Sequence, residues 1–140
     1  MPTLRAFRDA IAKLNETLPR PGLVLAVSET YDLHTQFATE FPNAKDPGVY
    51  ALVAGDGVEV LRIGKAQELG FRLGAYFMWA SREEGRGREK HPDYKEVRYI
   101  VTVPLPINRA FEASSIEEFL FREFRGSPPP LNVRLGRFED

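Results

Sequence analysis

Gly-Val-Tyr-Ala-Leu-Val-Ala-Gly-Asp-Gly-Val-Glu-Val-Leu-Arg-Ile-Gly-Lys-Ala, residues 48–66, is the stretch that decides how this chain folds. Residues 48–54 and 58–64 are rich in β-branched and aliphatic side chains, which favour β-strands. Between them lies Gly55-Asp56-Gly57, and a short glycine–aspartate segment between two such runs is typical of a β-hairpin. The stretch therefore predicts two antiparallel strands joined by a tight turn.

The length of this turn decides which side chains share a face of the hairpin. A two-residue loop would place Tyr50 opposite Ile63 and on the same face as Lys65. A three-residue loop, with Gly57 in the left-handed conformation, would place Tyr50 opposite Arg62. One residue of slip exchanges the two faces of a strand, so the two registers would build different sites. The turn residues permit both registers.

Composition limits the classes of protein to which the chain can belong. Its 140 residues suffice for one domain with appendages, and 43% hydrophobic and 28% charged residues are ordinary for a globular protein. The lack of cysteine excludes disulfides, thiolate zinc sites and cysteine nucleophiles. No run of about 18 apolar residues is present, which excludes a membrane span. The N-terminus lacks the apolar segment of a secretory signal, so we expect a cytoplasmic protein.

The distribution of charge is more informative than its total. A net charge of −1 does not indicate nucleic-acid binding. Residues 62–98, however, contain nine Lys or Arg and six Asp or Glu, a local excess of three positive charges. An excess of this size also occurs on ordinary solvated surfaces, but it marks the middle of the chain as the place where an anionic partner would bind.

The first 45 residues are expected to form an N-terminal extension of helix, strand and helix. Thr3 can cap a helix whose apolar residues recur at helical spacing over the next four turns. Residues 23–27 are a short apolar run typical of a strand, and residues 30–41 place apolar side chains four apart, as on a helix. A proline-bounded break follows. The sequence therefore divides into the extension, 1–45, and a main domain, 46–140.

After the hairpin the pattern changes from strand to helix and back. We expect, in order, a helix at 66–79, a mobile glycine-rich loop at 82–92, a third strand at 97–103, a helix capped by Ser114 or Ser115 and ending at Arg125, and an extended proline-rich segment that carries Asn132. The order strand-strand-helix-strand-helix predicts an α+β fold, in which a small three-stranded antiparallel sheet is flanked by helices.

Five motifs in this order resemble the GIY-YIG nuclease superfamily over residues 46–135. They are Gly48-Val49-Tyr50, Arg62-Ile63-Gly64-Lys65, Arg72, Glu117 and Asn132. The resemblance implies the three-stranded fold and the hydrolysis of phosphodiester bonds in nucleic acid, with DNA as the expected substrate. The chain departs from the family at Arg62, where the second tyrosine of the family name would stand. In the family both tyrosines line one site, which favours the three-residue turn.

The resemblance also implies a role for each of these residues. Tyr50 with Lys65 would orient or deprotonate the attacking water, and a phenol, which titrates near ~10 when free, needs a nearby cation to act as a base at neutral pH. Arg72 would bind the non-bridging phosphate oxygens through its planar fork of donors. Substrate binding would further involve Arg62 as an added phosphate clamp, Gly64 by letting the backbone approach a phosphate or the helix start, and Asn132 in a chiefly positional role.

The implied metal ion, Mg²⁺ or Mn²⁺, would be bound by Glu117. Glu118 competes for this role, since each glutamate stands three residues after a serine and fits a capping box. Helical phase separates the two: Glu117 falls within the apolar arc of the expected helix, whereas Glu118 falls outside it, near Arg122. A carboxylate aimed at an apolar face needs a partner, and a metal ion is one. We therefore expect Glu117 to be the ligand.

A second interpretation is a catalytically silent domain of the same fold that binds nucleic acid or protein. Arg62 in place of a tyrosine and the slightly negative net charge favour it. The two interpretations differ in one assay, because only the first predicts cleavage that requires Mg²⁺ or Mn²⁺. In the nuclease interpretation, residues 1–45 would pack on the domain or assist substrate binding.

Overall fold

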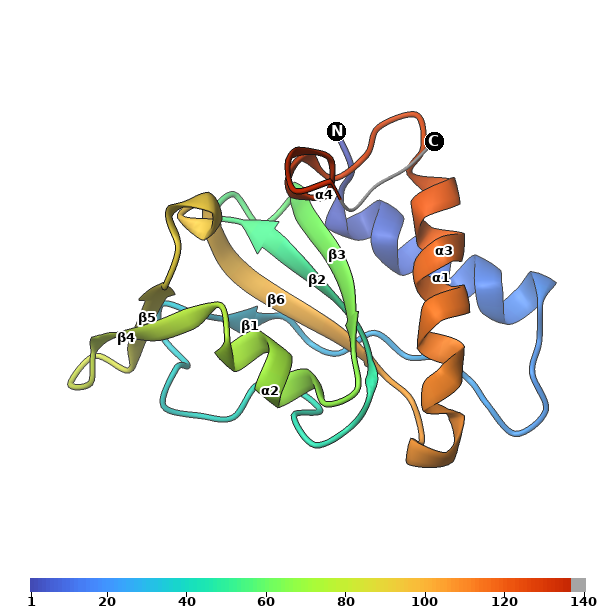
Figure 1. The fold of residues 1–140 in the computed structure, drawn as a ribbon, viewed down its shortest axis with the longest axis horizontal. Helices are drawn as coiled ribbons and strands as arrows, with labels where there is room; N and C mark the ends of the chain where they lie inside the picture. Colours follow the sequence, from blue (N-terminus) through green and yellow to red (C-terminus); the bar gives the residue numbers. More distant parts are fainter. Residues whose placement is uncertain (137–140) are drawn as a thin grey trace.

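The chain folds as an α+β protein, as the element order predicts, in the computed structural model, which describes residues 1–136. A four-stranded antiparallel sheet has helices on both faces and a two-stranded hairpin at one end (Figure 1). The strands are β1 (Tyr31–Asp32), β2 (Gly48–Ala54), β3 (Val60–Ala66), β4 (Phe77–Ser81), β5 (Arg86–Glu89) and β6 (Val97–Pro104). The helices are α1 (Leu4–Thr17), α2 (Leu69–Gly74), α3 (Ala113–Glu123) and α4 (Pro130–Arg134), with 3-10 turns η1 (Pro92–Tyr94) and η2 (Ile107–Glu112). Residues 137–140 of the expected main domain lie outside this description.

Three of the four strands in the central sheet are the ones that the sequence predicts. The strand order is β1-β6-β2-β3, and all neighbours are antiparallel. β2, β6 and β3 correspond to the expected strands, although β3 lies two residues further along the chain than expected. The expected count of three strands is corrected by β1, because Tyr31 and Asp32 pair with β6. This order leaves β3 as an edge strand.

The register of the β2–β3 hairpin differs from both expected registers. Tyr50 lies opposite Gly64, and Leu52 lies opposite Arg62. Side chains alternate between the faces of a strand, so Tyr50 and Arg62 still lie on one face, and Lys65 lies on the other. The three-residue turn was expected to bring Tyr50 and Arg62 to one face, and this part of the prediction is confirmed.

The turn between β2 and β3 explains the difference in register. Asp56 accepts hydrogen bonds at its Oδ1 atom from the backbone N–H groups of Val58 and Glu59, at 2.8 and 3.1 Å. These bonds extend the turn, and a bulge follows at the start of β3. Gly57 adopts φ of 73°, the left-handed conformation that the longer of the two expected turns requires.

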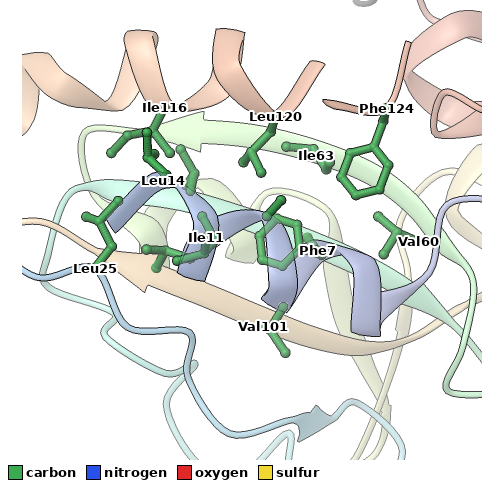
Figure 2. Packing of buried hydrophobic residues seen from close by; sticks show 14 of the residues in the cluster. Phe7, Ile11, Leu14, Leu25, Val60, Ile63, Val101, Ile116, Leu120 and Phe124 are labelled. Carbon is green, nitrogen blue, oxygen red and sulfur yellow. The ribbon is translucent and has the colours of Figure 1, made fainter. Parts of the chain in front are cut away.

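One face of the sheet is covered by α1 and α3 through an apolar core. Thr3 caps α1 as predicted, because its Oγ1 atom accepts a hydrogen bond from the N–H of Ala6 at 3.0 Å. Figure 2 shows this core, in which side chains from the two helices meet those of the strands and of the segment after α1: Phe7, Ile11, Leu14, Leu25, Val60, Ile63, Val101, Ile116, Leu120 and Phe124. The N-terminal helix therefore shares its core with the sheet.

The opposite face is covered by α2, the β4–β5 hairpin and the segment that follows β1. The expected helix at 30–41 is wrong, because β1 and a series of turns occupy this segment. The carboxylate of Asp32 binds the guanidinium of Arg98 at 3.0 and 3.1 Å, and its Oδ1 atom also accepts the N–H of His34 at 2.9 Å. Strand pairing and these side-chain bonds outweigh the helical spacing of the apolar residues.

Two further predicted elements on the N-terminal side and after β3 are corrected. Residues 23–27 form no strand, because the side chain of Asn15 binds both the N–H and the C=O of Leu25, at 2.9 and 2.8 Å. The helix expected at 66–79 ends at Gly74, and Phe77 and Trp79 beyond it belong to β4. Gly70 and Gly74 weaken the helix, and the pairing of β4 with β5 replaces the mobile loop that was expected.

The C-terminal part begins and ends its helices differently from the prediction. The expected caps are wrong: η2 leads directly into α3, so Ser115 donates its hydroxyl to the carbonyl of Glu112 at 3.0 Å and caps nothing. The proline run is extended only up to Pro129, because Pro130 occupies the first turn of α4. A proline is well tolerated there, since the first helical N–H has no intrahelical partner.

Candidate active site at the edge strand

Strand β3 is the element around which the predicted site residues gather. α2 follows it on one face of the sheet, α3 packs against it from the other, and α4 lies along its open edge (Figure 1). β3 itself carries Arg62, Gly64 and Lys65. The remaining predicted residues come from β2, α2, α3 and α4, so all of them lie on β3 or on elements that contact it.

Tyr50 and Gly64 are fitted to each other across the β2–β3 pair. The phenol of Tyr50 is 1% exposed and lies over the backbone of Gly64. A Cβ atom at residue 64 would stand 2.3 Å from the Tyr50 Oη atom, which is far inside contact distance. The glycine of the Arg62-Ile63-Gly64-Lys65 motif is thus explained by the space that the buried phenol takes.

Arg62 is buried among three tyrosines. Its Nη1 atom donates to the Tyr94 hydroxyl at 2.9 Å, and its guanidinium carbon lies 5.6 Å from the Tyr76 ring centre and 5.8 Å from that of Tyr94. Tyr76 in turn shares a 2.6 Å hydrogen bond with the hydroxyl of Tyr50. We call these four side chains the tyrosine–arginine cluster. Its members come from β2, β3, the residues after α2, and η1.

Within residues 1–136, phenols rather than carboxylates surround the charge of Arg62. The side chain is 5% exposed, and among the described residues no carboxylate binds it, while its Nε atom is buried without a hydrogen-bond partner. Burial disfavours the charge, but the neighbouring phenols of Tyr76, Tyr50 and Tyr94 outweigh it and raise the pKa of the guanidinium. Cation–π attraction to two rings supplies part of the compensation. The guanidinium is directed inward, away from any surface phosphate.

Burial also decides the protonation state of the Tyr50 phenol. It raises the pKa of this phenol well above its usual value near ~10, and the neighbouring Tyr76 raises it further, while Arg62 acts in the opposite direction. The expected effect of a nearby cation is thus present but is outweighed by desolvation. A neutral, buried phenol is suited to donating and accepting hydrogen bonds rather than to removing a proton from water.

Lys65 points to the other side of the strand. It is exposed, and its Nζ atom donates to the hydroxyl of Ser114, in the first turn of α3, at 2.8 Å. Glu117 is half-buried one turn further along this helix, whereas Glu118 is exposed and paired with Arg122 at 2.9 Å. The difference in exposure follows the helical phase on which the choice of Glu117 rests. Lys65 and Glu117 are therefore brought to one end of β3, apart from the face that holds Tyr50.

Asn132 closes the open edge of β3. Its side-chain Oδ1 atom accepts the N–H of Ile63 at 2.7 Å, and its Nδ2 atom donates to the C=O of the same residue at 2.8 Å. The side chain is 1% exposed, and both of its polar atoms are used in this contact. The chiefly positional role implied for Asn132 agrees with this geometry.

Arg72 lies in the last turn of α2 and is exposed to solvent. The adjacent Phe71 is 80% exposed, so this side of α2 is a free surface of mixed character. Trp79, the last residue of the helix expected at 66–79, belongs to β4. The predicted residues thus fall into three places: Tyr50, Arg62 and Gly64 inside one face; Lys65 and Glu117 at the end of β3; and Arg72 on the surface of α2.

Sequence reasoning missed the contribution of two tyrosines. Tyr76 lies within the helix expected at 66–79, and Tyr94 lies just after the loop expected at 82–92. One signal could have found them. An arginine in the apolar run of β3 must find hydrogen-bond partners when it is buried, and phenols in the following fifty residues are suitable partners.

The described part of the chain shows neither a cluster of metal-binding side chains nor a membrane-spanning helix. Within residues 1–136 there is no group of three or more His, Cys, Asp or Glu side chains that could surround a metal ion. None of the helices in the same range is long and apolar enough to cross a membrane.

Comparison with known proteins found no relative: no protein-family model, curated protein or solved structure matches the chain.

Proposed function

We propose that the chain is a GIY-YIG-type endonuclease that hydrolyses phosphodiester bonds in DNA and requires Mg²⁺ or Mn²⁺. The observation that supports this most is the hydrogen bond between Lys65 and Ser114, because it joins the end of β3 to the first turn of α3. Through this contact the ammonium of the strand motif and the carboxylate of Glu117 lie at the same end of the edge strand. Both groups are needed near a scissile phosphate.

The residues fit a metal that is bound mainly through water and substrate. Mg²⁺ commonly uses one or two carboxylates together with several waters and phosphate oxygens. Glu117, half-buried beside the sheet, would supply a carboxylate, and Glu118 is less suited because it is exposed. The metal would polarise the phosphate and stabilise the charge on the departing oxygen.

Positive charge for the phosphate would come from two exposed side chains. Lys65 lies beside the first turn of α3, and Arg72 projects from α2, so they approach β3 from different sides. An arginine can bind two non-bridging oxygens at once, whereas a lysine acts as a point charge. In this proposal Arg72 stabilises the pentacovalent phosphorus, and Lys65 holds the entering phosphate.

Tyr50 and Arg62 act in this proposal as positioning residues. The raised pKa of Tyr50 and its contact with Tyr76 favour a phenol that stays neutral. Of the phenols in the tyrosine–arginine cluster, Tyr76 is the one that is half-exposed. It therefore links the position of the buried side chains to the surface beside α2. Asn132 and Gly64 likewise fix the path of β3.

The test is a plasmid-nicking assay with Mg²⁺ and with Mn²⁺. Glu117→Gln should abolish nicking, because it removes the charge that binds the metal while preserving volume, and addition of EDTA should do the same. Glu118→Gln is the matched control and should nick at the wild-type rate. Loss of activity in Glu118→Gln but not in Glu117→Gln would show that Glu118, and not Glu117, binds the metal. Full activity in EDTA would contradict the metal requirement.

The second candidate is a domain of this fold that binds nucleic acid without cleaving it. The burial of Arg62 favours it, because this side chain replaces a tyrosine that lines the family site and is enclosed by phenols. A wild-type protein that binds DNA but leaves it intact with both metals would establish this function. Binding would then persist in Glu117→Gln.

A further inference from the structure

The β4–β5 hairpin has one packed face and one open face. On the packed face, Gly87 donates its N–H to the carbonyl of Leu33 at 2.8 Å, and a Cβ at residue 87 would stand 2.6 Å from the ring of Phe37. Phe37 also meets the ring of Trp79 edge-on at 4.9 Å. The hairpin is thereby fixed to the segment that follows β1, and it does not move as a free loop.

The open face carries two arginines. Arg88 lies opposite Met78, which is 47% exposed, and Arg86 stands two positions before Arg88 on the same side of β5. Both arginines are exposed. Of the carboxylates of the hairpin, Glu83 and Glu84 are in the turn, whereas Glu89, opposite Phe77, forms a long ion pair of 3.8 Å with Arg88.

We propose that this open face, which we call the β4–β5 ribbon, binds the phosphate backbone of duplex DNA. The proposal rests on the nucleic-acid function proposed above. Two side chains on alternate positions of a strand are about 7 Å apart. That spacing is close to the roughly 7 Å of helix axis spanned by two nucleotides of one DNA strand. Guanidinium groups at this spacing can each engage a phosphate without reading the base sequence.

The position of the ribbon suits a duplex that also reaches the candidate active site. Along the chain α2, with its exposed Arg72, connects the end of β3 to β4, and Figure 1 shows the hairpin projecting from the sheet beyond α2. A DNA helix seated on the ribbon would pass over α2. The ribbon thus supplies affinity at a distance from the residues proposed for cleavage.

The experiment measures binding of a short DNA duplex in EDTA, so that cleavage cannot occur, over a range of salt concentrations. Arg86→Gln combined with Arg88→Gln should weaken binding and reduce the slope of log K against log salt by about 2, since each lost phosphate contact removes roughly 0.9. The control combines Arg5→Gln with Arg125→Gln, which removes the same charge from exposed positions on and just after the helices of the other face. This control should keep the wild-type slope.

Several results would overturn the ribbon, and they differ from those that test cleavage. Equal affinity and slope in the ribbon variant, the control and the wild type would show that DNA binds elsewhere, while metal-dependent nicking could still stand. If the wild type binds no duplex, the ribbon is not a DNA-binding surface, and a protein becomes the expected partner of this face. If the ribbon variant loses binding but the wild type never cleaves, the ribbon stands and the endonuclease proposal fails.

Discussion

The two faces of the central sheet are built on different principles. On the side of α1 and α3 the strands contribute apolar side chains to the core, and the layers meet mainly through the burial of these side chains (Figure 2). On the side of α2 the same strands contribute Tyr50, Arg62 and Thr102, which are all buried. There the core depends on fitted hydrogen bonds and on a glycine that leaves room for a phenol. β3 contributes to both faces, because successive side chains of a strand point to opposite sides of the sheet.

This contrast implies that stability and site geometry are separable. Substitutions on the apolar face should lower the free energy of unfolding in proportion to the volume they remove. Substitutions on the α2 face should have smaller or opposite effects on stability, because a buried charge without a carboxylate contributes little net free energy. Four measurements would sharpen or break this comparison.

The largest effect is expected for Phe7→Ala on the apolar face. Phe7 is fully buried between α1 and the strands, and its removal leaves a cavity in a core with no polar groups to readjust. The free energy of unfolding should fall by about 3–5 kcal/mol in urea denaturation. Leu18→Ala, at a side chain 56% exposed just after α1, is the control and should change stability little. Similar losses in both variants would contradict the assigned core.

Gly64→Ala should have the largest effect on the α2 face. The new Cβ would displace the phenol of Tyr50 and break its bond with Tyr76, which we expect to cost about 1–3 kcal/mol of unfolding free energy. The matched control is Gly55→Ala in the neighbouring turn, where a Cβ meets nothing within 4 Å. A Gly64→Ala protein as stable as Gly55→Ala would show that the phenol lies elsewhere.

Alkaline pH should destabilise the protein through the buried phenols. Burial raises the pKa of Tyr50 above its usual value, and it raises the pKa of Tyr31 to about 12. The folded state therefore keeps protons that the unfolded chain releases above pH about 10, so stability is constant below that pH and falls above it. For Tyr50 the slope reaches at most about 1.4 kcal/mol per pH unit. Urea denaturation from neutral to alkaline pH measures it, and Tyr50→Phe should reduce the slope; an unchanged slope would contradict the burial of this phenol.

The smallest effect is expected for Arg62→Met. Methionine fills a similar volume without a charge, and replacement of a buried charged group by a packed apolar one is often neutral or stabilising. Thermal unfolding should therefore occur at or above the wild-type temperature, and DNA binding should keep its salt dependence, because the guanidinium is enclosed by Tyr76 and Tyr94. A shallower salt slope in Arg62→Met would show that Arg62 reaches phosphate, as the sequence implied.

Local signals in the sequence predicted the elements whose determinants are local. The cap at Thr3, the glycines around Asp56 and the apolar run of β6 each act within a few residues, and α1, the β2–β3 hairpin and β6 are confirmed. The register was not predictable to the residue, because neither expected turn included the side-chain bonds of Asp56 or the bulge at the start of β3. The helix predicted at 30–41 was wrong because Tyr31 and Asp32 pair with β6, which lies far along the chain.

For the predicted site residues, the strand face and the helical phase were predictable from the sequence, but the surroundings were not. The spacing of Arg62, Gly64 and Lys65 fixed which of them share a strand face, and helical phase separated Glu117 from Glu118. The sequence could indicate that a buried Arg62 needs phenol partners but not which ones, because Tyr76 and Tyr94 lie 14 and 32 residues away along the chain. Only the tertiary fold brings these rings to one guanidinium.

Asn132 has a consequence for how copies of this chain behave toward one another. An edge strand with free N–H and C=O groups is a template on which another chain can add a strand, and this is a common route to aggregation. The amide of Asn132 takes both backbone groups of Ile63, as the amide of Asn15 does for Leu25. A foreign strand would have to displace α4 before it could pair at the middle of β3. The short C-terminal helix thus protects the strand that carries the candidate site from edge-to-edge association.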